Sequence, residues 1–457
     1  MALPWTVLYF GPVLGFLLAL LLLAHLVRQQ RPPASTFAWL LAILLVPYAG
    51  VPLYMLFGGR KVRRMAGRKA DLDAAGSGGL EPDEGPEAAS AGLFPERTGN
   101  RLELLPTGEA AFRVLMDAIA GARHSICITT YILGKDRTGT AVVEALADKA
   151  RQGVGVYLLL DAVGSRGACG GFLDPLRDAG GKCAVFMPVL RLPVRGRANL
   201  RNHRKIVLVD GRTAIVGGMN LAGEYMGADG NAVRWRDASF LSSGPIVSDL
   251  YLVFQSDWAF AAHEDLLLPE AQAVCDEPDG VPVQVVPSGP DVPDDHLYDS
   301  ILTCVFSARE RVWIATPYFV PDEMLVSALC IAARRGVDVR VIVPAVSNHR
   351  LADLARRGFL RLVQESGGSV WLFQPGMLHG KIIVIDDSLG VLGSMNMDMR
   401  SLFLNYEIAL FARSERTVAE MASWVARSMD DCTMGVRAAS MGVQIAEGVG
   451  RLLAPLL

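Results

Sequence analysis

The first sixty residues carry two long apolar runs. Between residues 1 and 27 the only side chain that titrates near neutral pH is His25, and residues 34–59 carry no formal charge. Each run is long enough to cross a hydrocarbon core of about 30 Å as a helix. A secretory signal peptide would need a basic start that the first run lacks, and a buried hairpin of a soluble domain rarely stays uncharged for so long. We therefore predict a hairpin of two transmembrane helices.

Charge around the two runs predicts their orientation. The loop between them holds two arginines, whereas the second run is followed by a basic cluster of Arg60, Lys61, Arg63, Arg64, Arg68 and Lys69. The positive-inside rule then places both termini, and the large C-terminal part, in the cytoplasm. The basic cluster (the flank of a segment spanning residues 1–69) should attract anionic lipid head groups.

A different composition separates this segment from the rest. Residues 70–99 are acidic and rich in Gly, Pro and small side chains. Such a stretch has too little apolar surface to fold, so we expect a flexible tether.

Beyond residue 100, short apolar runs alternate with segments of helical periodicity, and the pattern occurs twice, at 100–275 and at 276–435. The predicted helices are 108–120, 138–152, 296–309 and 323–335, and the predicted strands are 125–133, 154–161, 311–320 and 337–344. Gly153 and Gly336 close the second helix of each half. Strands alternating with helices favour an α/β fold of two pseudo-symmetric α-β-α halves, each with a mostly parallel or mixed sheet covered by helices.

The strongest pattern is a motif repeated once in each half. His203, Lys205 and Asp210 recur at the same spacing as His379, Lys381 and Asp386, and the runs between Lys and Asp, 206–209 and 382–385, are typical of buried strands. Residues i and i+2 of a strand project from one face, so each His lies beside its Lys. A single such motif could be a buried structural histidine beside a surface lysine. A structural pair of this kind has no reason to recur with the same spacing, so the duplication favours a functional role.

The motif suits chemistry at an anionic phosphate. If the halves pack about a pseudo-twofold axis, one imidazole can attack phosphorus while the other moves the proton of the leaving or entering hydroxyl. Lys205, Lys381, Asn220 and Asn396 would hold phosphate oxygens. Each His needs a carboxylate to orient it, and one candidate lies downstream of each motif, Asp237 and Glu407. Asp210 and Asp386 complete the motif, but they end their strands and we expect a structural role.

Composition limits the remaining function classes. A net charge of −3 over 457 residues argues against nucleic acid as a partner, and seven cysteines without a C-x-x-C argue against a disulfide framework and a cysteine zinc site.

The doubled H-x-K-x-x-x-x-D followed by G-G/S-x-N resembles the phospholipase D superfamily, and the chain is similar to its bacterial cardiolipin synthases. The resemblance includes the spans ending PYAGVPLYMLFGGRK, then FQSDW at 254–258, PSGPD at 287–291, RSLFLNYE at 400–407 and the tail RLLAPLL. It implies a metal-free and cofactor-free transfer between two phosphatidylglycerol molecules, giving cardiolipin and glycerol through a phosphohistidine. By resemblance His203 is the nucleophile and His379 the general acid/base, an order that the sequence symmetry alone leaves open.

One departure and three alternatives accompany this resemblance. Relatives often continue the Trp-x-Asp segment with Thr-His, where this chain has Ala238 and Ser239, which could alter acceptor preference. The same residues would serve a phospholipase D-type hydrolase; a nuclease of the superfamily and a non-enzymatic scaffold are less favoured.

Some features keep two readings. Tyr131 and Tyr318 either line the cleft or fill the core, and a set of arginines either contacts lipid phosphates or forms a solvated loop: Arg191, Arg195, Arg197, Arg201 and Arg204. The tail at 436–457 predicts an amphipathic helix, on the membrane surface, which we slightly favour, or packed on the domain. A homo-oligomer is compatible with the sequence but leaves no mark in it.

Overall fold

The computed structural model describes residues 39–44, 46, 50, 51, 54, 94–188, 200–230, 234–266, 280–291 and 295–453. The chain divides into two compact units, one from residues 1–62 and 189–200 and the other from 63–188 and 201–457. In the first unit, the rings of Trp39 and Tyr54 meet edge to face at 5.4 Å in a small cluster with buried Ile43. The predicted transmembrane runs lie almost wholly outside the described residues. Within those residues, no helix has the length and apolar character needed to span a membrane.

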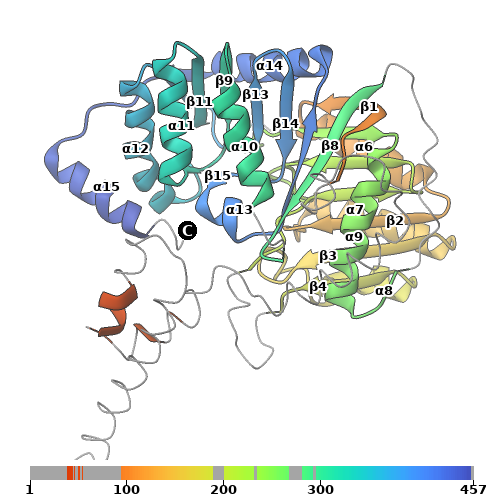
Figure 1. The fold of residues 1–457 in the computed structure, drawn as a ribbon. Coiled ribbons are helices and arrows are strands. Elements are labelled where there is room, and N and C mark those ends of the chain that lie inside the picture. Colours follow the sequence, from red (N-terminus) through yellow and green to blue (C-terminus); the bar gives the residue numbers. More distant parts are fainter. Residues whose placement is uncertain are drawn as a thin grey trace, which may run out of the picture. The chain divides into compact units, whose positions relative to one another are not determined.

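The second unit is built on one fifteen-stranded sheet in which the strands of both halves follow the same order (Figure 1). The first half runs β1 (Arg97–Leu105), β7 (Ser239–Ser243), β6 (Thr213–Gly217), β5 (Ile206–Val209), β2 (Ser125–Thr130), β3 (Gly155–Asp161) and β4 (Lys182–Phe186). The second runs β8 (Val281–Ser288), β16 (Glu407–Ala412), β14 (Leu389–Gly393), β13 (Ile382–Ile385), β9 (Arg311–Ala315), β11 (Asp338–Pro344), β12 (Ser369–Phe373) and β17 (Cys432–Met434). Antiparallel pairing of β1 with β8 joins the halves, so the predicted α/β duplication is confirmed.

The sheet is mixed, with parallel order confined to one side of each half. Strands β2, β3 and β4 are parallel, as are β9, β11 and β12. The two motif strands instead turn back as hairpins, β5 into β6 and β13 into β14. Connections this short can only link antiparallel strands. The predicted strands 206–209 and 382–385 have the observed bounds of β5 and β13.

Helices cover both faces of the sheet in equivalent positions. On one face lie α6 (Gly108–Gly121), α7 (Arg137–Arg151) and α8 (Asp174–Asp178), with counterparts α10 (His296–Ser307), α11 (Glu323–Arg334) and α12 (Arg350–Glu365). On the other face lie α9 (Ile246–Ala262) and α14 (Glu415–Met429) (Figure 1). Asp136 and Asp322 cap α7 and α11 at their N-termini. Gly153 and Gly336 follow these helices with φ of +88°, which confirms the predicted closures.

Three short elements complete the second half, namely β10 (Phe319–Val320), β15 (Met397–Asp398) and α13 (Met399–Phe403). The predicted strand 311–320 is therefore split into β9 and β10. The predicted tether also ends earlier than residue 99, because β1 begins at Arg97. There the Asn100 amide donates hydrogen bonds to the carbonyls of Arg97 and Val281 and fastens the strand to β8.

The C-terminal helix α15 (Met441–Leu453) packs on the domain, against α12. Glu447 is buried and bonds to Arg361 with 3.1 Å between Nη1 and Oε1, and the Arg451 guanidinium lies 5.9 Å from the ring of Phe359. One face of the helix therefore packs on the domain, the less favoured of the two alternatives, because its charged residues find partners on α12. Contact of the exposed face with a membrane stays a prediction.

The motif aspartates tie the hairpins to the start of the parallel strands. Asp386 has φ of +49°, and its carboxylate accepts hydrogen bonds from the backbone N–H groups of Arg309, Glu310 and Arg311 at 2.8–3.2 Å. Asp210, with φ of +53°, does the same for residues 123–125. Burial alone would raise the pKa of each carboxyl, but these backbone donors hold both pKa values below their usual range.

We predict that Asp386→Ala lowers the free energy of unfolding by roughly 2–3 kcal/mol, because three N–H groups lose their acceptor and alanine is strained at positive φ. Asp386→Asn should lose less, since asparagine tolerates this conformation. The native stabilisation is present above the unfolded pKa of about 4 and is lost as the pH falls below it. Thermal unfolding of the full chain in detergent measures all three effects.

Asp387→Asn is the matched control. Asp387 follows Asp386 in the chain and pairs with Arg311 through a side chain that is 71% exposed. Loss of this exposed ion pair should change the stability little. An unchanged unfolding midpoint together with abolished turnover in Asp386→Ala would contradict the structural role.

Candidate active site

The two motif histidines are positioned by backbone contacts that cross between the halves. His203 donates its N–H to the carbonyl of Tyr406 at 2.9 Å, just before β16 of the second half. Symmetrically, His379 donates to the carbonyl of Arg236 at 2.7 Å, just before β7 of the first half. The residues before each motif strand are therefore hydrogen-bonded to the backbone of the other half. Both histidines are buried at this junction.

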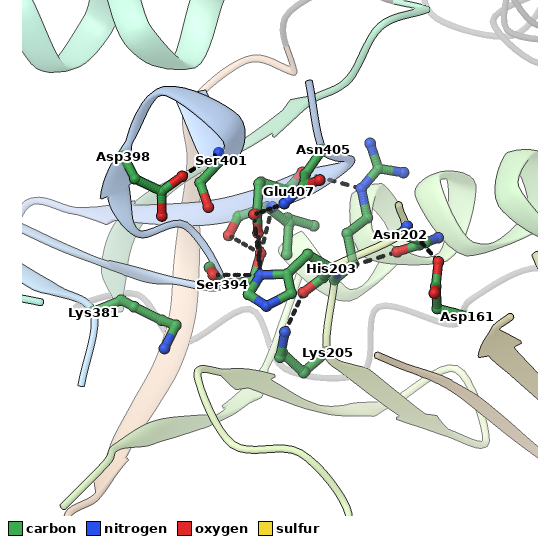
Figure 2. A network of polar contacts seen from close by, with 12 residues as sticks. Asp161, Asn202, His203, Lys205, Lys381, Ser394, Asp398, Ser401, Asn405 and Glu407 are labelled. Carbon is green, nitrogen blue, oxygen red and sulfur yellow. Dashed lines mark hydrogen bonds and ion pairs between the residues drawn. The ribbon is translucent and has the colours of Figure 1, made fainter. Parts of the chain in front are cut away.

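His203 is oriented by a carboxylate of the opposite half (Figure 2). Its Nδ1 lies 3.1 Å from Glu407 Oε2 and 3.1 Å from the carbonyl oxygen of Ser394. The Ser394 hydroxyl donates a short hydrogen bond to the same carboxylate oxygen. Because Nδ1 is engaged, Nε2 is the nitrogen left for chemistry. Among the described residues, no hydrogen bond to Nε2 of His203 is found.

His379 has the reciprocal arrangement. Its Nδ1 lies 2.6 Å from Asp237 Oδ2, and Lys381 Nζ lies 2.7 Å from Nδ1 and 3.1 Å from Nε2. Both orienting carboxylates expected from the sequence thus lie against a histidine. Each contacts the histidine of the other half, rather than that of the motif it follows, because β7 and β16 both start at the junction.

The two lysines lie beside the histidines, as their i, i+2 spacing predicts. Lys205 donates to the carbonyl of His203 at 2.5 Å and Lys381 to that of His379 at 2.6 Å. Burial lowers the pKa of Lys205 to about 7 and that of Lys381 to about 8. Both ammonium groups therefore lie where an anionic ligand would restore their charge.

Asn220 and Asn396 carry buried amide atoms at the same junction. Asn220 accepts a hydrogen bond from the N–H of Ile132 at 3.1 Å. Its Nδ2, and Oδ1 of Asn396, find no hydrogen-bond partner within the described ranges. A buried amide left open in this way is suited to a ligand oxygen or hydroxyl.

The two carboxylates differ in protonation. Burial raises the pKa of Asp237 to about 7. Burial would also raise that of Glu407, but His203, Lys205 and Ser394 together hold it below its usual value. Burial lowers the pKa of both histidines, and that of His379 falls furthest, with Lys381 adding to the effect. Glu407 is thus ionised at pH 7, whereas Asp237, whose pKa is about 7, is only partly ionised there.

Aromatic rings that the sequence did not fully identify line the histidines. Tyr131 lies 4.9 Å from His203 between ring centroids, so the reading that placed it in the cleft is favoured. The ring centroids of Tyr225 and Trp235 lie 5.0 and 5.3 Å from that of His379. The one sequence feature that points to these rings is the position of Trp235, two residues before Asp237. Tyr318 contacts His349 and Asn348 instead.

The arginines near the first motif divide into structural and open cases. Arg204 forms two 2.7 Å contacts with Asp257 of the FQSDW segment and donates to the carbonyls of Glu407 and Ser288, so it supports the junction. Arg201 pairs with Asp161 at 3.5 Å. Arg191, Arg195 and Arg197 lie outside the described residues.

The motif aspartates lie away from the histidine rings, whereas the segment that departs from relatives adjoins the carboxylate at His379, because the N–H of Ala238 donates to Asp237 Oδ1 at 2.7 Å. Asp210 and Asp386 bind backbone at the far ends of β5 and β13, as described above. Ser239, in the segment that departs from relatives, begins β7 and is buried with Lys205 around a cavity of about 20 Å³. In the described part of the chain, no cluster of three or more His, Cys, Asp or Glu side chains is arranged to hold a metal ion.

Comparisons with known proteins show the family and the fold. The family model described as cardiolipin synthase, PLD-like domain, matches residues 115–258 and 301–429, and a phospholipase D-nuclease N-terminal model matches residues 17–59. Cardiolipin synthase A of Pseudomonas putida (strain W619) is 34% identical, covering 98% of each chain. The cardiolipin synthase of Geobacillus kaustophilus is 34% identical over 94% of this chain and 90% of its own. Among solved structures, a phosphatidylserine synthase of Haemophilus influenzae shares the fold at a TM-score of 0.62, with 14% identity, covering 78% of this chain and 95% of that one.

The crossed pairs predict a pattern of non-additive kinetics. Glu407→Gln and Asp237→Asn should each slow phosphodiester transfer by about 10²–10⁴-fold, since each histidine loses its orienting carboxylate. In a His203→Ala background, Glu407→Gln should slow the reaction little further, because the two residues act as a unit. The rate losses of Glu407→Gln and Asp237→Asn should instead multiply in the double variant. Coupling of Asp237 with His203 instead would contradict the crossed assignment.

The lowered lysine pKa values predict a pH-dependent anion affinity. A lysine with a pKa near 7–8 is charged below that pH and neutral above it, so anion binding should weaken as the pH rises from 6 to 9. Sulfate keeps a constant charge over this range, and calorimetry can follow its dissociation constant. Lys205→Met should weaken binding and flatten the profile, and Lys135→Met, at an exposed site, should do neither. A pH-independent affinity in the unmodified protein would refute the prediction.

Proposed function

The chain belongs to the family of bacterial cardiolipin synthases with phospholipase D-like domains, and from this premise we propose that it transfers a phosphatidyl group between two phosphatidylglycerol molecules. The products are cardiolipin and glycerol, and the enzyme is a phosphatidyltransferase. The observation that carries the mechanism is the crossed geometry of two buried histidines, each with its Nδ1 against a carboxylate of the other half.

His203 fits the role of nucleophile. Its Nδ1 is held by ionised Glu407, while burial lowers the imidazole pKa and keeps the ring neutral. Nε2 can then attack the phosphorus of the first phosphatidylglycerol.

His379 with Asp237 fits the role of proton carrier. Because burial raises the pKa of Asp237 to about 7, the pair holds a proton below that pH and exchanges it readily near neutral pH. In the first step the P–N bond to His203 forms and the P–O bond to glycerol breaks. The glycerol oxygen takes the proton from His379 as it leaves.

The second step reverses these roles. The hydroxyl of a second phosphatidylglycerol gives its proton to His379, its oxygen attacks phosphorus, and the P–N bond breaks. Lys205, Lys381, Asn220 and Asn396 would hold the non-bridging oxygens as charge shifts in both steps. Water in place of the second lipid would give phosphatidic acid, which is the hydrolase alternative.

The membrane assignments belong to the same proposal. A lipid substrate with two acyl chains requires the site to open towards a bilayer, and the predicted hairpin in residues 1–69 would keep it there. The match of residues 17–59 to an N-terminal family model supports this arrangement. We propose an inner-membrane, multi-pass protein with a cytoplasmic catalytic domain, acting on phosphatidylglycerol among membrane lipids and on no nucleic acid.

The proposed function predicts the products of a single-lipid assay. Purified protein in mixed micelles with phosphatidylglycerol alone, without added metal, should release glycerol and form a four-chain lipid. Glycerol with phosphatidic acid would instead identify a hydrolase, and no turnover would contradict the choice of donor or acceptor.

Two histidine variants test the assigned roles in the same assay. His203→Ala and His379→Ala should each reduce turnover by at least about 10³-fold. With a phosphatidyl ester of p-nitrophenol, whose leaving group needs no proton, His379→Ala should still give a burst and a covalent lipid adduct, whereas His203→Ala should give neither. A burst in His203→Ala alone would reverse the assignment, and full activity in either variant would refute the two-histidine mechanism.

A further inference from the structure

A second contact constrains the His203 imidazole besides its carboxylate. Glu407 and the carbonyl of Ser394 hold Nδ1, but contacts at one nitrogen leave the ring free to tilt about that point. The ring of Tyr131 meets the imidazole edge to face, with the centroids 4.9 Å apart and the planes at 63°, an arrangement that aromatic pairs favour. The same ring lies 5.5 Å from Lys205 Nζ, within the range of a cation–π contact. Tyr131 therefore contacts both reactive side chains of the first motif.

Tyr131 is itself held by the loop that follows β3. A Cβ atom on Gly164 would lie 2.3 Å from the carbonyl oxygen of Tyr131 and 2.8 Å from Cδ2 and Cε2 of its ring. Only a residue without a side chain lets the loop approach this closely. The hydroxyl of the next residue, Ser165, donates to the carbonyl of Tyr131 at 2.8 Å and accepts the N–H of Leu133 at 3.0 Å. The backbone at and after Tyr131 is therefore fixed to this loop.

One buried carboxylate ties the same loop to the first motif. Asp161 ends β3, and its Oδ1 accepts the N–H of Gly164 at 3.1 Å. Its Oδ2 accepts the N–H of Asn202, the residue before His203, at 3.0 Å (Figure 2). The loop under Tyr131 and the segment that carries His203 thus share one anchor, which holds the two rings at a fixed separation.

The second half has a different residue at the equivalent position. The strand registers align Thr129 with Ala315, because these residues lie opposite the first residue of β5 and of β13. Pro317 therefore stands where the first half has Tyr131. Tyr318 is displaced by one residue and contacts a loop histidine instead, with the ring centroids 5.6 Å apart. The two tyrosines thus lie in similar stretches of sequence, but only Tyr131 contacts a motif histidine.

We propose that Tyr131 is a positioning residue for the nucleophile, whose ring holds the His203 imidazole so that Nε2 stays aimed at the donor phosphorus. This inference rests on the role of His203 in the proposed function. Attack requires the lone pair of Nε2 to point at phosphorus, and a small tilt of the ring lowers the rate. Glu407 fixes one nitrogen of the imidazole, and Tyr131 fixes the plane.

The ring also affects the protonation of the nucleophile. Burial lowers the pKa of His203. The titratable groups around this imidazole, besides Tyr131, are two lysines, a second histidine and two carboxylates, namely Lys205, Lys381, His379, Asp398 and Glu407. Without the half-buried ring of Tyr131, water would reach the imidazole and its pKa would rise towards the usual value of about 6.5. The imidazole would then be protonated, and unable to attack, up to a higher pH.

Burst kinetics with the p-nitrophenyl ester test this step alone, because its leaving group needs no proton. In the full-length protein, Tyr131→Ala should slow the burst about tenfold, the loss expected for one aromatic pair, and should shift the acid limb of the burst rate to higher pH. Tyr131→Phe keeps the ring and should preserve both the rate and the pH profile. Tyr318→Ala, the matched control, should change neither.

Two glycine variants move the ring without removing it. Gly164→Ala should also slow the burst, because the added methyl group displaces Tyr131. Gly167 lies in the same loop, and a Cβ atom on it would meet no described atom within 4 Å. Gly167→Ala should therefore leave the burst unchanged, and unfolding midpoints check that each variant is folded.

Three results would overturn the inference. They are an unchanged burst in Tyr131→Ala, an equal loss in Tyr131→Phe, which would assign the effect to the hydroxyl, and an equal slowing in Tyr318→Ala. Absence of cardiolipin with the unmodified protein would instead refute the proposed function, and the comparison of bursts would still hold.

Discussion

The structure of the catalytic unit depends on the crossing of two short segments between its halves. The backbone before β16 bonds to the backbone before β5, and the backbone before β7 bonds to that before β13. These contacts bring each histidine to a carboxylate of the other half. They also exclude water from the lysines, which is the origin of the unusual pKa values at the junction. Buried Arg204 pairs with Asp257 and donates to the carbonyls of Glu407 and Ser288, which links the two halves next to the crossing.

Burial acts differently on the two pairs although their residues are similar. Glu407 accepts a hydrogen bond from the Ser394 hydroxyl and contacts the imidazole of His203, so it can stay ionised without contact with water. Asp237 accepts an N–H from its own neighbour, Ala238, and contacts His379, but burial dominates its pKa. In the proposed mechanism, a duplicated motif thus acquires two functions through a few surrounding groups. Sequence symmetry left the order of the histidines open for this reason.

Local signals predicted the elements that carry the chemistry. The apolar runs after Lys205 and Lys381 have the bounds of β5 and β13, and Gly153 and Gly336 end their helices as expected, because these features depend on neighbours in the chain. The crossed pairing of Asp237 and Glu407 was not predicted, since it depends on how the halves dock. The pairing of β1 with β8 and the packing of α15 on α12 depend on tertiary contacts in the same way. The membrane hairpin stays a prediction.

The crossing also limits how this protein can change over evolution. Each half contains a histidine and a lysine, yet neither contains the carboxylate that contacts its own histidine. A half separated from its partner would keep a recognisable motif but lose the group that orients it. The repeats of a duplicated gene usually drift apart once one copy suffices. Here neither repeat contains a complete histidine–carboxylate pair, so a change in one repeat removes an orienting group from the other.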